Sequence, residues 1–286
     1  MRVIMGLLWC LCLLPAMGWA QVDSLQGAWK HSAVFRVAGT QAGFQNWQKG
    51  GVSSLALTSS FEGTFQKTTS RWNSTHQIHL VLGTIQQDTL AFRKSDDQIR
   101  YQGSFDVKWL NSLRPTISVG VETQFLPGFN YKKNPFGDER VPPVKVSDIL
   151  SPAYVTQGLG LTYAPWMWVR LRFGFGAKET VVLIERLRPL YGVRITRPVR
   201  VEAGLESRME FDREVARNVR WKSSAAFFAA FNKPELPDAV WRNEILMRVN
   251  SWLTTRLETE MLYDRDISRK IQFREVLALS VVFRLL

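Results

Sequence analysis

The feature that most constrains the fold of this chain is an alternation of apolar and polar residues that recurs along nearly the whole sequence. Successive side chains of a β-strand point to opposite faces, so a period of two predicts strands with one apolar and one polar face. The clearest stretch would carry Val199, Val201, Ala203, Leu205, Met209 and Phe211 on one face and Arg200, Glu202, Glu206, Arg208, Glu210 and Asp212 on the other.

The alternation predicts about twelve strands, many of them long enough to cross a lipid bilayer. Their ranges are 28–37, 52–66, 71–85, 98–110, 114–125, 153–164, 167–177, 198–212, 217–231, 239–250, 252–264 and 271–286. A sheet within lipid has to close on itself, because an open edge would leave backbone groups without hydrogen-bond partners. The predicted fold class is therefore all-β: a transmembrane antiparallel up-and-down β-barrel, apolar outside and polar inside.

An even number of strands places both chain termini on the same side of the membrane, as is usual for single-chain bacterial barrels. For this reason, and because proline is disfavoured inside a sheet, the stretch from Arg186 to Thr196 is predicted to be a loop. Short links would lie on the periplasmic side and longer ones on the external side. The short links are 67–70, 111–113, Pro165, 213–216 and 250–252, and the long ones are 38–51, 86–97, 126–152, 178–197, 232–238 and 265–270. Within one long link, Asp96 and Asp97 predict a turn.

The N-terminus has the pattern of a secretory signal peptide. A basic residue, Arg2, precedes the apolar run 3–14, and small residues precede the expected cut after Ala20. The run is too short for a transmembrane helix. Residues 1–20 are therefore expected to be removed, which leaves residues 21–286 as a single outer-membrane β-barrel domain.

The composition excludes several kinds of chemistry. Both cysteines, Cys10 and Cys12, lie in the signal peptide, so the mature chain has no disulfide, thiol nucleophile or cysteine-ligated metal. No zinc-binding spacing and no glycine-rich phosphate-binding motif is present, so no metal and no cofactor are expected.

The charge indicates which partners the chain would meet. A formal net charge of +12 suits nucleic acid or an anionic membrane. Export argues against nucleic acid, which leaves outer-membrane lipids as the expected partner. Because the chain ends in an alternating strand, from Phe273 to Leu286, the barrel-insertion machinery is a second expected partner during biogenesis.

Tryptophan lies near the predicted periplasmic ends of the strands. An indole prefers the water–lipid interface because it is apolar and has one N–H donor. The residues that predict an aromatic girdle at these ends are Trp29, Trp72, Trp109, Trp166, Trp168, Trp221 and Trp252. By alternation, Trp168 is expected to point inward.

The candidate functional residues are charged side chains expected to line the lumen. They are Arg100, Lys108, Arg170, Arg172, Arg200, Glu202, Glu206, Arg208, Arg256, Glu258 and Glu260. One interpretation is an anion-preferring pore, because an arginine-lined constriction attracts anions. The other is a ladder of ion pairs between strands that fills the lumen and fixes the strand register. The two agree if the ladder leaves a narrow gap.

A hydrolase would need a serine and a third group positioned beside a histidine. His31 and His76 are expected on the apolar face, and His79 on the lumen side. Ser74 lies two residues from His76, but the sequence shows no third member, so no catalytic residue is predicted. Because some twelve-stranded barrels hydrolyse lipids at a site on the lipid-facing wall, a lipid-modifying hydrolase stays open as an alternative.

Two loop carboxylates, Asp264 and Asp266, could hold Ca²⁺ at an external strand end. Arg265 between them disfavours a cation, so both aspartates are expected to be solvated turn residues. No metal site is therefore predicted there.

The stretch GFQNWQKGG, residues 43–51, has the composition of a catalytic or phosphate-binding loop. A phosphate cradle would need the N-terminus of a helix behind it, whereas a strand follows. The two final glycines allow a sharp turn into that strand. The stretch is therefore predicted to be a structured cap at the barrel mouth, formed by Phe44, Asn46, Trp47, Gly50 and Gly51.

Several motifs together resemble a known family. They are F-x-N-W-x-x-G-G (Phe44 to Gly51), SPAY (Ser151 to Tyr154), NVRWKSSAAFF (Asn218 to Phe228), VNSWL (Val249 to Leu253), YDRDI (Tyr263 to Ile267) and QFREVLALS (Gln272 to Ser280). Over nearly all of its mature length, the chain is similar to uncharacterised outer-membrane β-barrel proteins of Bacteroidetes-type bacteria, which carry only a domain-of-unknown-function label. The resemblance implies a barrel in the outer membrane of a Gram-negative bacterium, without an activity. That family tends to have an acidic residue between the two aspartates of the Y-D-x-D-I motif, where this chain has Arg265.

The predicted function is that of an integral outer-membrane barrel acting as a narrow, porin-like, anion-preferring pore. Two alternatives stay open. One is the lipid-modifying hydrolase. The other is a non-conducting scaffold or docking barrel that uses the long links 126–152 and 178–197.

Overall fold

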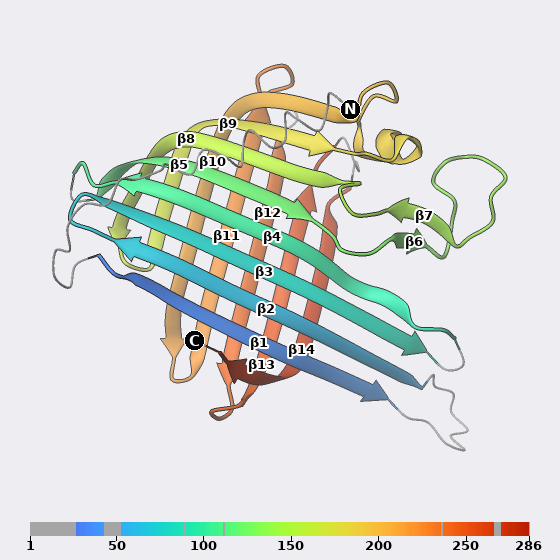
Figure 1. Ribbon diagram of the computed structural model, residues 1–286, viewed down its shortest axis with the longest axis horizontal. Coiled ribbons are helices and arrows are strands. Elements are labelled where there is room, and N and C mark those ends of the chain that lie inside the picture. Colours follow the sequence, from blue (N-terminus) through green and yellow to red (C-terminus); the bar gives the residue numbers. More distant parts are fainter. Residues whose placement is uncertain are drawn as a thin grey trace.

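A computed structural model describes residues 27–42, 53–87, 90–110, 112–235, 237–265 and 270–285. Within this part of the chain, twelve antiparallel strands close into a barrel (Figure 1). They are β1 (Trp29–Ala42), β2 (Ser54–Thr68), β3 (Trp72–Gln87), β4 (Arg93–Val107), β5 (Leu113–Thr123), β8 (Ala153–Trp166), β9 (Val169–Val181), β10 (Val199–Ala216), β11 (Val219–Ala230), β12 (Asp238–Arg248), β13 (Leu253–Tyr263) and β14 (Gln272–Arg284). The predicted fold class and strand number are confirmed. The predicted signal peptide, residues 1–20, lies outside the described residues.

The barrel is wound up and down in chain order. Each strand pairs with its neighbours in the sequence, and β5 pairs with β8 across the link that separates them. β1 closes the barrel on β14 through a seam that runs from Val34–Arg284 to Ala38–Ser280. Since β1 pairs with β2 along its whole length, the seam is the shorter of the two ladders that β1 forms.

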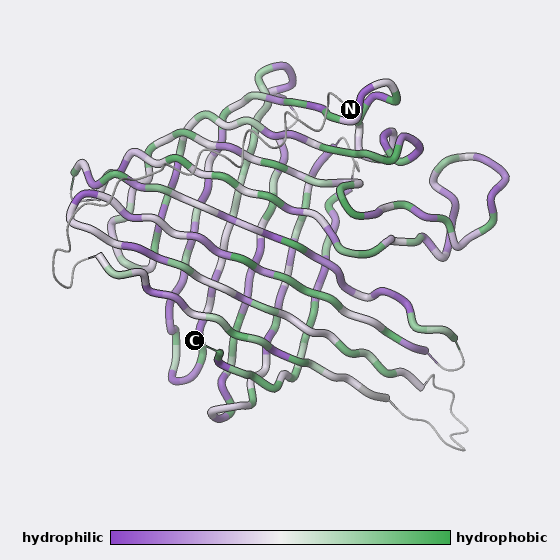
Figure 2. Tube along the Cα trace, viewed as in Figure 1, coloured by the Kyte–Doolittle hydropathy of each residue, from purple (hydrophilic) through white to green (hydrophobic). Residues whose placement is uncertain are grey.

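The two faces of the wall differ as the alternation predicts. Figure 2 shows hydrophobic and hydrophilic residues alternating along the strands. Large apolar side chains such as Leu159 and Phe173 are 60% and 64% exposed, whereas the charged Asp106 and Arg256 are only 1% and 5% exposed. A water-soluble protein shows the opposite preference. This inverted distribution is that of an outer-membrane-type barrel whose outer wall meets lipid.

Short links lie at one end of the barrel and long connections at the other, as predicted. The short links are 69–71, 108–112, 167–168, 217–218 and 249–252. The seven tryptophans of the predicted girdle lie at this short-link end. For example, Trp29 and Trp72 begin β1 and β3, and Trp166 ends β8.

Several strands extend beyond their predicted ranges: β1 runs to Ala42 and β9 to Val181, past the predicted ends at 37 and 177, and β4 begins at Arg93 instead of 98. β10 runs to Ala216, so the predicted link 213–216 belongs to the strand, and the turn is the dipeptide 217–218. Asn218 has a φ of 64°, a left-handed conformation that asparagine tolerates better than most residues. A two-residue turn is therefore sufficient, and β10 extends beyond the end that the apolar–polar alternation predicts.

The predicted turn at Asp96 and Asp97 is wrong, because both residues lie within β4. The carboxylate of Asp97 accepts hydrogen bonds from the backbone N–H groups of Phe125 and Leu126, both at 2.8 Å. Asp96 pairs with Arg274 of β14. Partners far along the chain thus hold these aspartates in a strand against their local turn preference.

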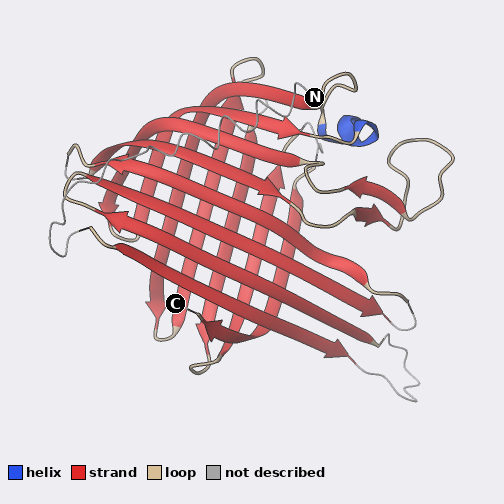
Figure 3. Ribbon diagram, in the orientation of Figure 1, coloured by secondary structure: helices blue, strands red, loops and turns tan. Residues whose placement is uncertain are grey.

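The links 124–152 and 182–198 fold together at the long-link end and form a small unit, here called the loop unit (Figure 3). The first link contains the hairpin of β6 (Gly128–Asn130) and β7 (Val144–Ser147), and the second contains the 3-10 helix η1 (Glu185–Tyr191). The predicted absence of a strand across this second link is confirmed. No helix in the described part of the chain is long and apolar enough to cross a membrane.

The loop unit has its own small apolar core. Val182, Leu187 and Val193 form a buried cluster. The hydroxyl of Tyr191 donates a 2.9 Å hydrogen bond to the carbonyl oxygen of Val146, which joins the helix to the hairpin. Burial raises the pKa of Tyr191 to about 12, so the hydroxyl keeps the proton that it donates.

Leu187→Ala is expected to loosen the loop unit without opening the barrel. Leu187 is fully buried, and removal of a buried leucine side chain costs roughly 2–5 kcal/mol. Limited proteolysis of the refolded protein is expected to cut the variant within the two links, while the barrel keeps its heat-modifiable migration on a gel. Ile195→Ala, which removes an exposed side chain from the same unit, is the control. Loss of the folded barrel band in Leu187→Ala would contradict this expectation.

Two glycines let β8 and β9 approach closely. Gly160 and Gly174 face each other in register. A Cβ atom added at Gly160 would lie 2.3 Å from the carbonyl oxygen of Phe173, and one added at Gly174 would lie 2.3 Å from that of Leu159. Because a backbone cannot move aside as a flexible side chain can, larger residues do not fit at either position.

Gly160→Ala is therefore expected to lower the free energy of unfolding by roughly 1–3 kcal/mol, the usual cost of overpacking. The measurement is urea-dependent unfolding in lipid, followed by tryptophan fluorescence. Gly39→Ala is the matched control, because its Cβ would meet only the Leu57 side chain, at 3.6 Å. Equal stability of the two variants would show that the β8–β9 contact adapts freely.

Candidate functional site

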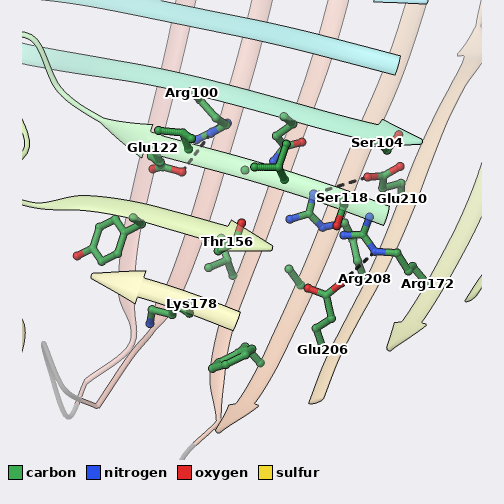
Figure 4. Close-up of a pocket in the computed structure, with 18 of the residues that line it drawn as sticks. Arg100, Ser104, Ser118, Glu122, Thr156, Arg172, Lys178, Glu206, Arg208 and Glu210 are labelled. Carbon is green, nitrogen blue, oxygen red and sulfur yellow. Dashed lines mark hydrogen bonds and ion pairs between the residues drawn. The ribbon is translucent and has the colours of Figure 1, made fainter. Parts of the chain in front are cut away.

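The polar inner face of the barrel encloses two adjoining chambers. One has a volume of about 280 Å³ and the other about 660 Å³. Both are lined by Arg100, Arg170, Glu210, Arg242 and Glu260, so the chambers meet at this level of the lumen. Figure 4 shows the smaller chamber, with charged side chains of several strands directed into it.

The linings of the two chambers differ near the ends of the barrel. The smaller one is lined by Asp238 and Asp264, which lie at the long-link ends of β12 and β13. The larger one is lined by Trp168 and Asp212, which lie near the short-link end. The ring of Trp168 nevertheless stacks on that of Trp166 at 5.0 Å and lies 5.6 Å from that of Phe211, on the apolar outer face of β10, so the expectation that this ring points inward is wrong.

Acidic and basic side chains are balanced in both chambers. Among the described residues, the smaller chamber is lined by six of each: Arg100, Arg170, Arg172, Lys178, Arg208 and Arg242, and Glu122, Glu206, Glu210, Asp238, Glu260 and Asp264. The larger is also lined by six of each: Arg100, Arg170, Arg220, Lys222, Arg242 and Arg274, and Glu62, Glu210, Asp212, Glu244, Glu258 and Glu260. The excess positive charge of the sequence therefore lies outside the chamber walls.

One ion pair crosses the lumen. Arg242 of β12 lies 3.1 Å from Glu122 of β5. Around the wall, four strands separate β12 from β5 on one side and six on the other. Glu122 also accepts a 3.2 Å hydrogen bond from Arg100, and Arg242 donates a 2.7 Å hydrogen bond to Glu260. These four side chains form a continuous line of charges across the interior, of which Figure 4 shows the Arg100–Glu122 contact.

A second set of charges joins strands on either side of the seam. Glu62 of β2 lies 2.8 Å from Arg36 of β1 and 3.1 Å from Arg256 of β13. Arg256 also lies 2.9 Å from Glu258. Removing one partner from such a buried set leaves an uncompensated charge, which costs several kcal/mol.

A third set lies near the long-link end. Lys178 of β9 lies 2.5 Å from Asp238 and 3.2 Å from Asp264. Asp264 is only 3% exposed, so the expectation of a solvated turn residue is wrong for this aspartate. The ammonium group of Lys178 is the positively charged partner of Asp264, and no sequence pattern indicates this pair. Asp266 lies outside the described residues, and within them no three His, Cys, Asp or Glu side chains lie close enough to hold a metal ion.

The structure brings most of the predicted lumen residues to the inner face. Those that line the smaller chamber are Arg100, Arg170, Arg172, Glu206, Arg208 and Glu260. Glu258 lines the larger one. Arg200 and Glu202 pair with each other at 3.2 Å, and Arg256 belongs to the set around Glu62.

The structure does not place the remaining predicted residues, Lys108 and the five cap residues, in the chambers. Lys108 lies beyond the end of β4, where its ammonium donates a 2.5 Å hydrogen bond to the carbonyl oxygen of Thr69 in the adjacent short link, so it belongs to the turn region and not to the lumen. The predicted cap residues Phe44, Asn46, Trp47, Gly50 and Gly51 lie outside the described residues.

The bridging pairs were missed by sequence reasoning. Alternation places Glu122, Lys178 and Arg242 on polar faces, which is the only signal for them in the sequence. The pairing between strands that are not neighbours leaves no pattern along the chain. It follows from the diameter and register of the closed barrel.

The histidines take the predicted sides of the wall, but one expectation about them is wrong. His79 lines the larger chamber, and His76 lies on the outer face. The pair of Ser74 and His76 does have a third member. Ser74 Oγ lies 2.9 Å from Nε2 of His76, and Nδ1 of His76 lies 2.8 Å from the hydroxyl of Tyr101.

Comparison with known families relates the chain to proteins without an assigned activity. A family model described as "Protein of unknown function (DUF3078)" matches residues 40–129, under a third of the chain. The expected resemblance to a family of unknown function is thus confirmed over these residues, and the Bacteroidetes-type origin stays a prediction. A search of curated proteins found no significant match.

Several solved structures are similar to the chain at low sequence identity. The translocator domain of autotransporter NalP from Neisseria meningitidis is 9% identical, with 99% of this chain and 96% of that one covered and a TM-score of 0.38. The COG4313 outer membrane channel from Pseudomonas putida F1 is 10% identical, with 92% of this chain and 100% of that one covered and a TM-score of 0.39. Pseudomonas aeruginosa OccK5 (OpdH) is 8% identical, with 90% of this chain and 98% of that one covered and a TM-score of 0.28. None of these similarities bears on the activity of the chain.

Proposed function

We propose that the mature chain is an integral outer-membrane protein of a Gram-negative bacterium and a narrow channel for small polar solutes. Its apolar outer wall, polar interior and belt of tryptophans support the membrane location. The observation that carries the channel is the Glu122–Arg242 pair, which crosses the lumen where the two chambers meet. In this proposal the pair is the constriction that limits passage.

The charge of the chambers supports weak selectivity. Ion selectivity in a pore follows from the fixed charges at its narrowest part. Among the described residues, each chamber is lined by equal numbers of acidic and basic side chains, so neither ion sign is favoured strongly. The proposal therefore departs from the anion preference expected from the arginines of the sequence, because carboxylates on facing strands offset them.

Loss of either bridging side chain is expected to raise the single-channel conductance and to shift the selectivity in opposite directions. Glu122→Ala leaves Arg100 and Arg242 without this carboxylate, which favours anions. Arg242→Ala leaves Glu122 and Glu260 without this guanidinium, which favours cations. The measurement is conductance and reversal potential in planar bilayers across a KCl gradient.

Glu206→Ala is the control for these variants. Glu206 pairs with Arg172 of the neighbouring strand at 3.3 Å, along the wall and not across the lumen. Its loss is expected to leave the conductance close to that of the unchanged protein. If the wild-type protein and all three variants are folded but show no conductance, the channel proposal fails. A scaffold role through the loop unit then becomes the better account.

The membrane location has its own test. The mature protein is expected to remain in the outer-membrane fraction after a carbonate wash, to show heat-modifiable migration, and to begin at residue 21. Release by carbonate would show that the barrel is not embedded in lipid, whatever its conductance.

A further inference from the structure

We infer that the outer wall carries an acyl-ester hydrolase site formed by Ser74, His76 and Tyr101, which acts on glycerophospholipid at the short-link end of the barrel. The serine hydroxyl, the imidazole and the phenol form one hydrogen-bonded chain, with contacts of 2.9 and 2.8 Å. A serine becomes a nucleophile when it bonds to an imidazole that a third group holds in place. This arrangement is separate from the lumen and from its ion pairs.

The local structure explains why the three side chains meet. Ser74 and His76 are two residues apart on β3, so both point outward. His76 lies opposite Gly103 of β4, and Tyr101 lies two residues from that glycine on the same face. A Cβ atom at Gly103 would lie 2.8 Å from the Tyr101 hydroxyl oxygen. The glycine therefore leaves the space in which the phenol reaches Nδ1 of the imidazole.

The protons are arranged for general-base catalysis when His76 carries its proton on Nδ1. In that tautomer, Nδ1–H donates to the hydroxyl oxygen of Tyr101, and the lone pair of Nε2 accepts the proton of the Ser74 hydroxyl. Tyr101 is then a positioning residue, because it fixes the tautomer and orientation of the ring, while Ser74 and His76 are the catalytic residues.

The surroundings indicate the substrate. The Trp29 ring lies 5.9 Å from the His76 ring, and Trp72 stacks on Phe105 at 5.4 Å. Such indoles lie at the water–lipid interface, at the level of the head groups. A phospholipid beside this wall therefore presents its acyl-ester carbonyl groups at the level of the serine, whose residue is 9% exposed.

A lysine beside the serine suits a phospholipid in particular. Lys67 of β2 lies directly opposite Ser74 in the strand register. Its ammonium lies 5.6 Å from the Trp72 ring and 6.0 Å from the Trp29 ring. A cation in this place attracts the phosphate of a lipid head group and the oxyanion that forms on the ester carbonyl.

The reaction is a serine-dependent hydrolysis in two stages. The Ser74 Oγ attacks the ester carbonyl carbon while Nε2 of His76 takes the hydroxyl proton, and the carbonyl π electrons move onto oxygen. The tetrahedral species collapses, the bond to the glycerol oxygen breaks, and His76 protonates that oxygen, which releases a lysophospholipid. Water then attacks the acyl-serine with His76 as base, and a fatty acid leaves as Ser74 regains its proton.

The test uses the refolded mature protein in detergent with phosphatidylglycerol in mixed micelles. A fluorophosphonate probe is expected to label the protein covalently, and fatty acid is expected to be released. Ser74→Ala is expected to abolish labelling and to lower the release by about 10³-fold or more. His76→Gln is expected to lower it by about 10²- to 10⁴-fold, the usual contribution of a general base.

Tyr101 requires a readout that separates positioning from folding. Tyr101→Phe is expected to lower kcat with little change in KM, because the phenol contacts the imidazole and not the lipid. Gly103→Ala is expected to act in the same direction, since it displaces the phenol. The controls are His31→Gln and Ser59→Ala, which change an outward-facing histidine and serine on β1 and β2 and are expected to keep full activity.

Heat-modifiable migration is measured for every variant, so that loss of activity is not confused with loss of the fold. The inference is overturned if the folded, unchanged protein is neither labelled nor releases fatty acid. It is also overturned if release persists in Ser74→Ala. In either case, the three side chains are an interfacial hydrogen-bond chain without a catalytic role.

Discussion

Closure of the backbone hydrogen-bond ladder is the constraint on which the rest of this structure depends. In lipid, each backbone group without a partner costs several kcal/mol, so strands can cross only as a closed sheet. Here the first and last strands meet through the short seam from Val34–Arg284 to Ala38–Ser280. Once the sheet is closed, alternation leaves no choice about the side chains, because every second one enters a narrow interior and the others meet lipid.

The narrow interior explains the ion pairs. Charged side chains that point inward from most of the strands are little screened by bulk water, and a charge there needs a partner within reach. The partner need not lie on a neighbouring strand, as Arg242 and Glu122 show across the lumen. Removing one member of such a network leaves a buried charge without its partner, and the side chains of the network also occupy part of the interior volume. The same pairs therefore link strands and occupy the lumen.

Glycines in the barrel wall leave space for contacts that a larger residue would prevent. Gly160 and Gly174 permit a backbone contact that no larger residue allows. Gly103 does something different, since its missing side chain is the space that the Tyr101 phenol occupies beside His76. The fold thus tolerates polar side chains on a lipid-facing surface where they satisfy one another. A hydrogen-bonded serine, histidine and tyrosine lie beside tryptophans at the short-link end of the barrel.

The number of strands, their inner and outer faces and the two ends of the barrel can be predicted from the sequence, because period-two alternation and tryptophan position are local properties of the chain. The contacts between charged and polar groups, in contrast, depend on the folded barrel. Arg242 and Glu122 are 120 residues apart, Lys178 and Asp264 are 86 apart, and His76 and Tyr101 are 25 apart. Their contacts depend on the register and curvature of a closed sheet, which no stretch of the chain specifies alone.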